Sequence, residues 1–455
     1  MRVSDDTIVA LASAAGPAGV AVVRVSGQNV PDIAEAILGR IPQARQAHLA
    51  AFLDVDGQAI DHGLALYFPA PNSFTGEHVL ELQGHGSPVL IDLLLTRLMA
   101  CGARMARPGE FSERAFLNDK LTLDQAEAIA DAIAAGSVVT ARAAVRSLEG
   151  VFAREIDALV AELVALRVYT EGAIDFPDEE GVDFLGDGAI KTRLDALRQR
   201  LSHLQAGATQ GAGFRDGLRV VIIGQPNVGK SSLLNRLAQR DTAIVTAMAG
   251  TTRDVLSERL SLGGLPLTVV DTAGLRDTDD LVEAEGVRRA RAELASADHV
   301  LLVTDAARSL NTAEQALLAD IPVETGVTLL ANKIDLAEQE AGSYTETWHG
   351  HTVSGVALSA LDGRGFEHLA ARLKAVAGVS AEGEPPFVAR RRHLDALARA
   401  AAALARGDER LMIDEAGELL AEELRLAQTA LGEITGKVSS DDLLGAIFSS
   451  FCIGK

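Results

Sequence analysis

Cysteine is scarce in this sequence, with only two among 455 residues, and aromatic residues make up 4%. Two thiols cannot build a framework of disulfides, so the composition is typical of a reducing compartment and we expect a cytoplasmic protein. No apolar run approaches the roughly 20 residues that a bilayer-spanning helix needs, so no membrane partner is expected. Asp5 and Asp6 precede the first apolar stretch, unlike the cationic start of a signal peptide.

Positive charge is also in deficit, because the formal net charge is −21 at pH 7. A protein that binds nucleic acid without sequence preference is usually basic, since phosphate neutralisation supplies its affinity. We therefore expect no DNA partner, and any contact with RNA must use a local basic patch or a partner protein. The apolar content of 48% and the charged content of 23% are those of a globular protein.

The spacing of apolar residues divides the chain into four stretches. Residues 1–118 alternate short β-rich runs with turns and include one amphipathic helix, the pattern of an α/β domain. Residues 119–213 and 381–455 read as helical, and the run from Val145 to Leu166 predicts one buried helix face. Residues 214–380 alternate strands and helices, which indicates a parallel sheet. We therefore predict an α/β and all-α multidomain protein, in which a helical domain is interrupted by an inserted α/β domain.

The segment GQPNVGKS, residues 224–231, has the pattern of a phosphate-binding P-loop. It follows the apolar run LRVVIIG and opens the helical run SSLLNRLAQR, which is the strand–loop–helix context that the motif requires. Backbone N–H groups of such a loop close around phosphates, Lys230 supplies positive charge, and Ser231 offers a hydroxyl to magnesium. The predicted phosphate contacts are Asn227, Val228, Gly229, Lys230, Ser231 and Ser232.

A second motif, NKID, predicts which base is bound. Asn332, Lys333 and Asp335 follow the apolar run GVTLLA. A carboxylate there can accept hydrogen bonds from N1–H and the exocyclic amine of guanine, a pair that adenine does not offer. After a P-loop, the motif therefore selects GTP. The second base-side loop is predicted at Ser359, Ala360 and Leu361.

Two further motifs lie between the P-loop and NKID. Asp271 ends the run LPLTVV and begins DTAG, where a carboxylate can hold magnesium through water and Gly274 can place an N–H on the γ-phosphate. The earlier segment GTTRD supplies Thr252 as a magnesium ligand and γ-phosphate sensor. Four ordered motifs on matching elements predict a GTPase, that is, a GTP hydrolase. The other contacts predicted in these loops are Thr246, Ala247, Met248, Ala249, Gly250, Thr251, Thr272 and Ala273.

The residue after DTAG is Leu275, where Ras-type GTPases carry a glutamine that orients the attacking water. Leucine cannot hydrogen-bond water, so either hydrolysis is negligible or the catalytic charge comes from elsewhere. Asn227 offers an amide oxygen that could hold a monovalent cation against the phosphates in place of an arginine finger. Glu283 or Glu285 could position the water, and spacing alone separates neither from the other nor from solvated helix charges.

Together these motifs give a chain that resembles, over nearly every segment, the MnmE (also called TrmE) family of bacterial tRNA-modification GTPases. The segments that carry the resemblance include PNSFTGEHVLELQGHG, RPGEFSERAFLNDKLTLDQAEAIADAI, AIDFPDEE, GQPNVGKSSLLNRL, AGTTRD, DTAGLR and the tail GEITGKVSSDDLLGAIFSSFCIGK. In this family an N-terminal α/β domain binds folate and dimerises, and a Ras-like P-loop G domain is inserted into a helical domain. The G domains approach each other when GTP binds.

The resemblance implies a homodimeric, potassium-stimulated GTPase that works with the flavoprotein MnmG in a heterotetramer-like complex. Together such proteins install a carboxymethylaminomethyl or aminomethyl group at carbon 5 of the wobble uridine in certain tRNAs. A tetrahydrofolate derivative supplies the one-carbon unit. The resemblance leaves open whether ammonium or glycine provides the nitrogen, which tRNAs are modified, and how hydrolysis is coupled to modification.

The resemblance also implies roles for single residues. The potassium (K⁺) ligands fall on Asn227, Thr246, Met248 and Thr251. The magnesium (Mg²⁺) ligands fall on Ser231 and Thr252, and the catalytic glutamate falls on Glu283. The folate contacts fall on Arg24, Glu81, Lys120 and Lys455. The loop AMAG departs from a more polar family loop, and we expect Met248 to act through its backbone carbonyl.

The tail FCIGK places one of the two cysteines, Cys452, near Lys455. Prenylation is disfavoured, because lysine is a poor final residue for that box and no polybasic run precedes it. Two interpretations stay open. Either the helix SSDDLLGAIFSSF docks and the thiol is packing, or the tail reaches the folate pocket and Cys452 is catalytic, as nucleophile or proton donor.

Two other functions remain as alternatives. A ribosome-assembly GTPase would carry an RNA-binding appendage or a second G domain, and this acidic sequence has one G domain and no KH-like segment. A GTP-driven switch or scaffold would have a folate pocket that is only structural. The basic run Arg390–Arg392 could touch tRNA, but a solvated helix start is the stronger interpretation.

Overall fold

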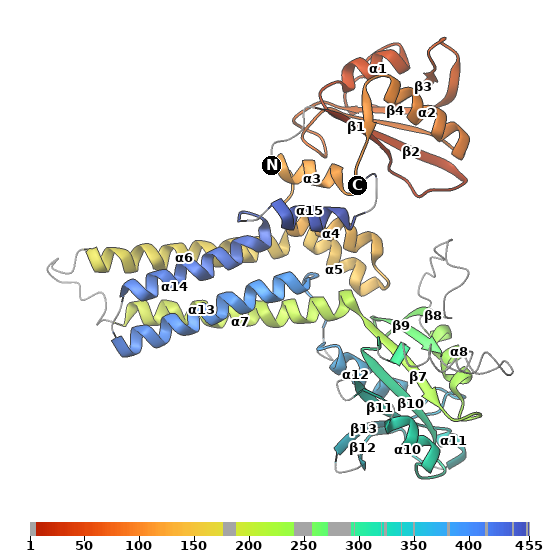
Figure 1. Ribbon diagram of the computed structural model, residues 1–455, viewed down its shortest axis with the longest axis vertical. Helices are drawn as coiled ribbons and strands as arrows, with labels where there is room; N and C mark the ends of the chain where they lie inside the picture. Colours follow the sequence, from red (N-terminus) through yellow and green to blue (C-terminus); the bar gives the residue numbers. More distant parts are fainter. Residues whose placement is uncertain are drawn as a thin grey trace. The chain divides into compact units, whose positions relative to one another are not determined.

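The computed structural model in Figure 1 describes most of the chain. The described residues form two compact units: unit 1 comprises Met1–Ala130, Leu148–Asp183 and Glu409–Lys455, and unit 2 comprises Asp131–Ser147 and Phe184–Asp408. Within the described ranges, every helix is too short or too polar to cross a bilayer. Those ranges are 6–175, 188–240, 257–271, 293–294, 296–319, 321–322, 325–337, 339–348, 351–379, 383–414, 417–438, 441–451 and 454.

Unit 1 contains a six-stranded sheet in the order β3-β4-β5-β2-β1-β6. Its first five strands pair antiparallel, and the short strand β6 joins β1 in parallel. Burial alternates along β2 and in the second half of β4, which gives the sheet one face for helices, whereas the first four residues of β1 are all buried. The strands are β1 Thr7–Leu11, β2 Ala18–Ser26, β3 His48–Leu53, β4 Ala59–Phe68, β5 Val79–Gly86 and β6 Ala103–Met105.

Helices α1 and α2 cover that face of the sheet. Ile37 of α1 and Leu98 of α2 lie in one apolar cluster with Val25 of β2. Helix α1 ends at Gly39, whose φ of 70° forms the left-handed cap that glycine adopts most easily. The one amphipathic helix predicted in this stretch, in the segment SPVLIDLLLTRLMACG, is α2, whereas the structure has two more helices there, α1 and α3. The bounds are α1 Val30–Leu38, α2 Pro88–Ala100 and α3 Glu110–Leu117.

The helical stretch that follows divides at a glycine rather than forming one continuous face. Helix α5 ends at Leu148 and α6 begins at Val151, because Gly150 turns the chain with a φ of 79°. Val145 on α5 is 48% exposed, whereas Phe152 on α6 is fully buried, so the predicted single buried face is wrong at its first residue. The helices of this stretch are α4 Leu123–Ala134, α5 Val138–Leu148 and α6 Val151–Asp175.

In unit 1, α6 lies beside α14 (Figure 1). Arg167 Nη1 donates to Gln428 Oε1 at 2.9 Å, and Lys437 Nζ pairs with Asp157 Oδ1 at 2.7 Å. The C-terminal helix α15 packs its apolar face, including Phe448, against Leu123 of α4. The bounds are α14 Gly417–Thr435 and α15 Asp441–Ser449.

In unit 2, α7 and α13 are joined by Asp408, whose Oδ1 accepts from Lys191 Nζ at 2.6 Å. Helix α13 begins at Arg391, as the basic run predicted. The preceding residue, Arg390, is not a solvated helix start, because its Nη2 donates to Asp131 Oδ1 at 2.8 Å. The bounds are α7 Ala189–Asp216 and α13 Arg391–Asp414.

Unit 2 also holds a seven-stranded sheet in the order β12-β13-β11-β10-β7-β9-β8. The middle strands are parallel as predicted, but both edge strands, β8 and β12, run antiparallel to their neighbours. The turn Gly263-Gly264 between β8 and β9 is too short for the crossover that a parallel pair requires. The strands are β7 Leu218–Gly224, β8 Ser257–Leu262, β9 Leu265–Asp271, β10 His299–Asp305, β11 Gly326–Asn332, β12 Gly342–Trp348 and β13 His351–Ala357. The helices are α8 Lys230–Arg240, α10 Thr312–Ala319, α11 Ile334–Ala337 and α12 Phe366–Val376.

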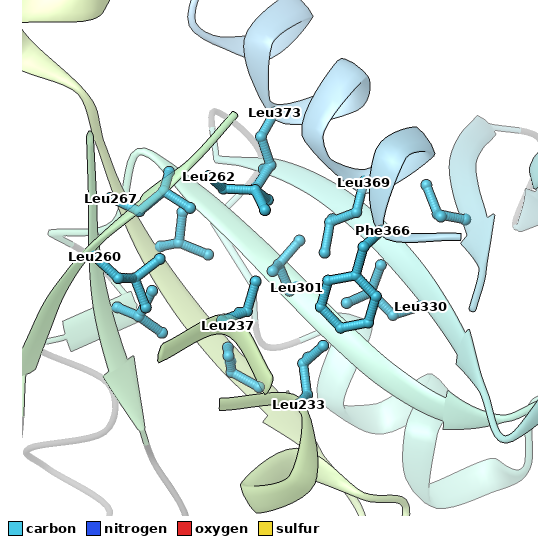
Figure 2. Close-up of a cluster of buried hydrophobic side chains, with 14 of the residues drawn as sticks. Leu233, Leu237, Leu260, Leu262, Leu267, Leu301, Leu330, Phe366, Leu369 and Leu373 are labelled. Carbon is cyan, nitrogen blue, oxygen red and sulfur yellow. The ribbon is translucent and has the colours of Figure 1, made fainter. Parts of the chain in front are cut away.

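Figure 2 shows the apolar cluster that packs helices on this sheet. Leu233 of α8, Leu267 of β9 and Leu373 of α12 belong to it, and each is at most 2% exposed. Because α8 begins directly after the P-loop, burial of its apolar face fixes where that loop lies relative to the strands.

Candidate functional site

The P-loop connects β7 to α8 as the motif predicted. Asn227 and Gly229 have φ values of 63° and 98°, so the loop makes a left-handed turn in which asparagine and glycine are the favoured residues. Lys230 Nζ donates to Gly224 O at 3.0 Å and to Gln225 O at 2.9 Å. The ammonium group is thus held inside the loop, where it would meet a bound phosphate.

Asn332 joins three of the predicted segments. Its Nδ2 donates to Val228 O in the P-loop at 2.8 Å, and its Oδ1 accepts from Ala360 N at 2.9 Å. A Cβ at Gly229 would lie 2.3 Å from Asn332 Nδ2, so the loop can approach this amide only with glycine there. Asn332 is 2% exposed, and its side chain links the P-loop, the NKID segment and the second base-side loop.

The two charged residues of NKID differ in their partners. Lys333 Nζ pairs with Asp305 Oδ2 at 2.9 Å, and this hydrogen bond holds the pKa of Asp305 below its usual value. Asp335 is different, because its buried Oδ1 has no hydrogen-bond partner among the described residues. A buried acceptor without a donor is costly, so this atom fits the guanine N–H donors that the motif predicts.

The second base-side loop is held by backbone and side-chain contacts. Ser359 is fully buried, and its Oγ accepts from Asp362 N at 3.2 Å. Arg236 Nε of α8 donates to Ala360 O at 3.1 Å, while Leu361 is 75% exposed. The structure therefore brings the P-loop, NKID and this loop together at the carboxyl ends of β7 and β11, where ligands bind in open parallel sheets.

The remaining nucleotide contacts are described only in part. Ser231 and Ser232 are exposed in the first turn of α8, so their hydroxyls are open to a ligand. Asp271 ends β9, in register with Ile222 of the P-loop strand. The predicted residues that lie outside the described ranges are Thr246, Ala247, Met248, Ala249, Gly250, Thr251, Thr252, Thr272, Ala273, Gly274, Glu283, Cys452 and Lys455.

A second group of predicted residues meets on the six-stranded sheet. Arg24 of β2 and Glu81 of β5 are cross-strand partners, and Arg24 Nη2 pairs with Glu81 Oε1 at 2.9 Å. The Arg24 guanidinium lies 5.4 Å from the ring centroid of Phe74 and 5.8 Å from that of Phe111. This half-buried cation beside an aromatic ring suits a flat anionic ligand.

Lys120 and the C-terminal tail approach the same part of unit 1. A Cβ at Gly76 would lie 3.2 Å from Lys120 Cε, which places the lysine beside the loop that carries Phe74. A Cβ at Gly454 would lie 2.2 Å from Leu11 O, so Gly454 is in contact with the end of β1. Leu11 pairs with Val23, the neighbour of Arg24 in β2. Gly454 thus lies next to the strand that carries Arg24, and Cys452 and Lys455 lie outside the described residues.

The sequence interpretation missed a buried network of charges beneath this group. Arg114 Nη1 donates to both carboxylate oxygens of Glu77 at 3.1 Å, and Nη2 donates to Glu110 Oε1 at 3.1 Å. All three side chains are at most 6% exposed. Burial alone would raise the pKa of Glu110, but hydrogen bonds led by that from Arg104 outweigh it and lower the pKa. The sequence signal for this network is the alternation of acidic residues and arginines in RPGEFSERAF.

Comparison with known proteins covers the whole chain. Residues 7–120 match the family described as GTP-binding protein TrmE N-terminus, and residues 123–452 match the MnmE helical domain. A tRNA modification GTPase MnmE from Pseudomonas aeruginosa strain UCBPP-PA14 is 55% identical over 464 residues, covering 100% of both chains. The chain belongs to the MnmE family. A second MnmE relative, from Chromohalobacter salexigens, is 54% identical over 454 residues and covers 99% of this chain and 98% of its own.

Membership of the MnmE family makes the chain a GTP hydrolase of the tRNA-modification class, for which GTP with Mg²⁺ is implied at the P-loop. Among solved structures, a crystal structure of an Aquifex aeolicus Era variant bound to GDP and aluminium fluoride matches 41% of this chain and 66% of its own. Its identity is 25% and its TM-score is 0.27, so the MnmE assignment depends on the full-length relatives.

Proposed function

We propose that this chain couples potassium-stimulated GTP hydrolysis to modification of tRNA wobble uridine in the cytoplasm. With a flavoprotein of the MnmG type, it adds a carboxymethylaminomethyl or aminomethyl group at carbon 5, and a tetrahydrofolate derivative supplies the one-carbon unit. The observation that carries the proposal is the 55% identity over the full length of both chains to a tRNA modification GTPase MnmE. The proposed domain boundaries remain those predicted from the sequence, with domains or half-domains at residues 1–118, 119–213, 214–380 and 381–455.

The GTPase part of the proposal depends on two residues of this sequence. Leu275 stands where a water-orienting glutamine would be, so the transition-state charge needs another source. Asn227 adopts a positive φ of 63° in the P-loop, and its amide is the proposed potassium ligand. Glu283 is the proposed residue that positions the attacking water. Two copies of the chain in a homodimer would bring their G domains together when GTP binds.

The folate part is supported by the chemistry of the Arg24 group. Reduced folates carry a flat pterin and carboxylates, and the half-buried Arg24 and Glu81 with exposed Lys120 offer a cation, an acceptor and a second cation. The docked Gly454 supports delivery of Lys455 and Cys452 to this group. Cys452 is the proposed nucleophile or proton donor.

The decisive experiment analyses wobble uridine in tRNA from a strain that lacks this protein. We expect the modified nucleoside to disappear, to return with the wild-type chain, and to stay absent with Lys230→Ala. A normal nucleoside profile in the deletion strain would contradict the proposed reaction. In the purified chain, GTP turnover in potassium should exceed turnover in sodium, and Asn227→Ala should remove that difference.

A further inference from the structure

Arg236 ties the second base-side loop to α8, the helix that follows the P-loop. Its Nε donates to Ala360 O at 3.1 Å, and its Nη2 donates to the next carbonyl oxygen, Leu361 O. These two N–H groups lie on one edge of a planar guanidinium, so a single arginine can hold two consecutive carbonyls in one geometry. Arg236 lies outside all four nucleotide motifs of the sequence, and no role has yet been given to it here.

Helix α8 gives this arginine a fixed starting point. Leu233 and Leu237 of α8 are at most 1% exposed and belong to the apolar cluster in Figure 2. Arg236 directly precedes Leu237 and is itself half-buried. Because burial of the two leucines holds α8 on the sheet, the hydrogen bonds of Arg236 fix the second base-side loop relative to the P-loop helix.

Contacts from other elements meet the loop at Ala360. Hydrogen bonds within the loop, such as that from Ser359 N to Arg364 O at 3.0 Å, shape its turn. From outside the loop, Asn332 Oδ1 accepts from Ala360 N at 2.9 Å, and Arg236 Nε donates to Ala360 O. The backbone of Ala360 is therefore held on both its N–H and its C=O side, and Arg236 supplies the second of these contacts.

Fixing the Ala360 carbonyl also fixes the N–H group of the next residue. A trans peptide unit is planar, so the Leu361 N–H points away from Ala360 O and hence away from Arg236. The Leu361 side chain is 75% exposed, so its own packing does not hold this peptide. Among the residues that the structure describes, none accepts a hydrogen bond from Leu361 N. Arg236 thus orients a backbone donor that is open to a ligand.

An oriented donor in this loop matches one edge of guanine. Ile334 N donates to Leu358 O at 3.4 Å, so the chain that leads into the loop runs next to the NKID segment. Asp335 is the predicted acceptor for N1–H and the exocyclic amine of guanine. The O6 acceptor of guanine lies next to N1–H, whereas adenine carries an amine donor at that position. A donor from the second loop would therefore complete the recognition of guanine at O6.

We infer that Arg236 is a positioning residue for guanine selection, because it orients the Ala360–Leu361 peptide toward O6 of the bound base. Arg236 acts through the loop rather than by contact with the nucleotide. Its removal should weaken discrimination at O6 and leave discrimination at the exocyclic amine, which Asp335 reads. The inference rests on the proposed place of residues 359–361 at the base, and it needs guanine-nucleotide binding only, so it is independent of the proposed tRNA reaction.

Competition against a fluorescent guanine nucleotide on the full-length chain tests the inference with GDP, 6-thio-GDP and IDP. In 6-thio-GDP a sulfur atom, a weak acceptor, replaces O6, and IDP lacks only the exocyclic amine. Wild type should bind GDP about tenfold more tightly than 6-thio-GDP. In Arg236→Met this ratio should fall below about threefold, while the ratio of GDP to IDP affinity stays within about twofold of wild type. Arg236→Lys, which keeps the charge but holds only one carbonyl, should give an intermediate ratio, and it serves if Arg236→Met fails to fold.

The matched control is Arg364→Met, which removes an arginine of the same loop that is 52% exposed and pairs with Asp362. It should keep both wild-type ratios. The inference is overturned if neither Arg236 variant lowers the ratio of GDP to 6-thio-GDP affinity, or if Arg364→Met lowers it as much. It is equally overturned if Arg236→Met lowers both ratios alike, because the whole base site is then distorted. A wild-type chain that binds GDP and 6-thio-GDP equally would overturn the place of residues 359–361 at the base and the inference with it.

Discussion

In the seven-stranded sheet, the predicted ligand contacts follow the carboxyl ends of strands, with the P-loop after β7 and Asn332 at the end of β11. In the six-stranded sheet, Arg24 and Glu81 face each other from within β2 and β5, and an aromatic ring from a loop completes the group. The first arrangement places several contacts in each short loop. The second gathers one residue from each of several elements, so only the first forms motifs that a single sequence displays.

The two sites also differ in how their buried charges are satisfied. Near the nucleotide site, Asp335 Oδ1 is buried without a donor among the described residues, so it can accept a hydrogen bond from a ligand. Beneath the N-terminal group, Glu77 and Glu110 are fully engaged by Arg114 and their other partners. Removing a charge should therefore cost binding at the first site and folding stability at the second.

The largest effect is expected for Arg114→Met in unit 1. Methionine fills a similar volume but leaves Glu77 and Glu110 buried without their shared cation, which typically costs about 3–5 kcal/mol. Native-state hydrogen exchange of α3 and β2 amides would measure this loss. The control is Lys437→Met, whose partner Asp157 is 42% exposed and whose own side chain is 58% exposed. An exposed pair should contribute less than about 1 kcal/mol, so equal losses in the two variants would contradict the distinction.

Asp335→Asn should act on binding instead. The substitution keeps the shape but removes the charge that accepts from guanine, and two charge-assisted hydrogen bonds weaken together. We expect GTP affinity to fall by about 100-fold, or roughly 2.7 kcal/mol, in equilibrium titrations with a fluorescent guanine nucleotide. Leu336→Ala, a truncation of a 74% exposed neighbour, should leave affinity unchanged. Wild-type affinity in Asp335→Asn would show that the buried oxygen does not read the base.

A third test uses pH to probe the seven-stranded sheet at the first residue of β10, far from the nucleotide loops. His299 is 1% exposed and its Nε2 is 2.8 Å from Thr328 Oγ1; burial, with a smaller effect of the Arg372 charge, lowers its pKa from 6.5 to about 4. The pKa of His299 is lower in the folded chain than in the unfolded chain, so His299 contributes its full share to the free energy of unfolding above pH 6.5. That share is lost as the pH falls toward 4. At pH 5 the loss should be about 2 kcal/mol.

Urea denaturation followed by Trp348 fluorescence measures this, because the single tryptophan lies on β12 of the same sheet. His299→Gln should unfold with a smaller pH dependence between 6.5 and 5 than wild type. His368→Gln, on the surface of α12 with 41% side-chain exposure, should retain the wild-type dependence. Parallel pH curves for wild type and His299→Gln would exclude His299 as the cause.

Sequence reasoning located the nucleotide site because its contacts are contiguous, and the strand–loop–helix context fixes where each loop lies. It predicted Asn332 as a motif residue but not as the residue that links the P-loop to Ala360, since that role depends on contacts between segments far apart in the sequence. It predicted a parallel sheet but not its two antiparallel edge strands, because alternation of strands and helices does not reveal edge hairpins. Arg24 and Glu81 were named only through family resemblance, because cross-strand register is not visible in composition or periodicity.

The smallest effect concerns the C-terminal tail and sharpens the comparison most, because it asks whether the N-terminal group is a binding site at all. Gly454 has a φ of 95° and no room for a Cβ beside Leu11 O, so Gly454→Ala should displace the tail that carries Lys455. If Lys455 contacts the folate carboxylate as proposed, losing one charged hydrogen bond should weaken reduced-folate binding by about tenfold, or roughly 1.4 kcal/mol. Isothermal titration calorimetry would measure the affinity, with GTP turnover expected to stay at the wild-type rate.

Gly445→Ala is the matched control, because nothing lies within 4 Å of its added Cβ and α15 accommodates alanine. If both glycine variants bind folate like wild type, the docked tail is packing rather than part of the pocket.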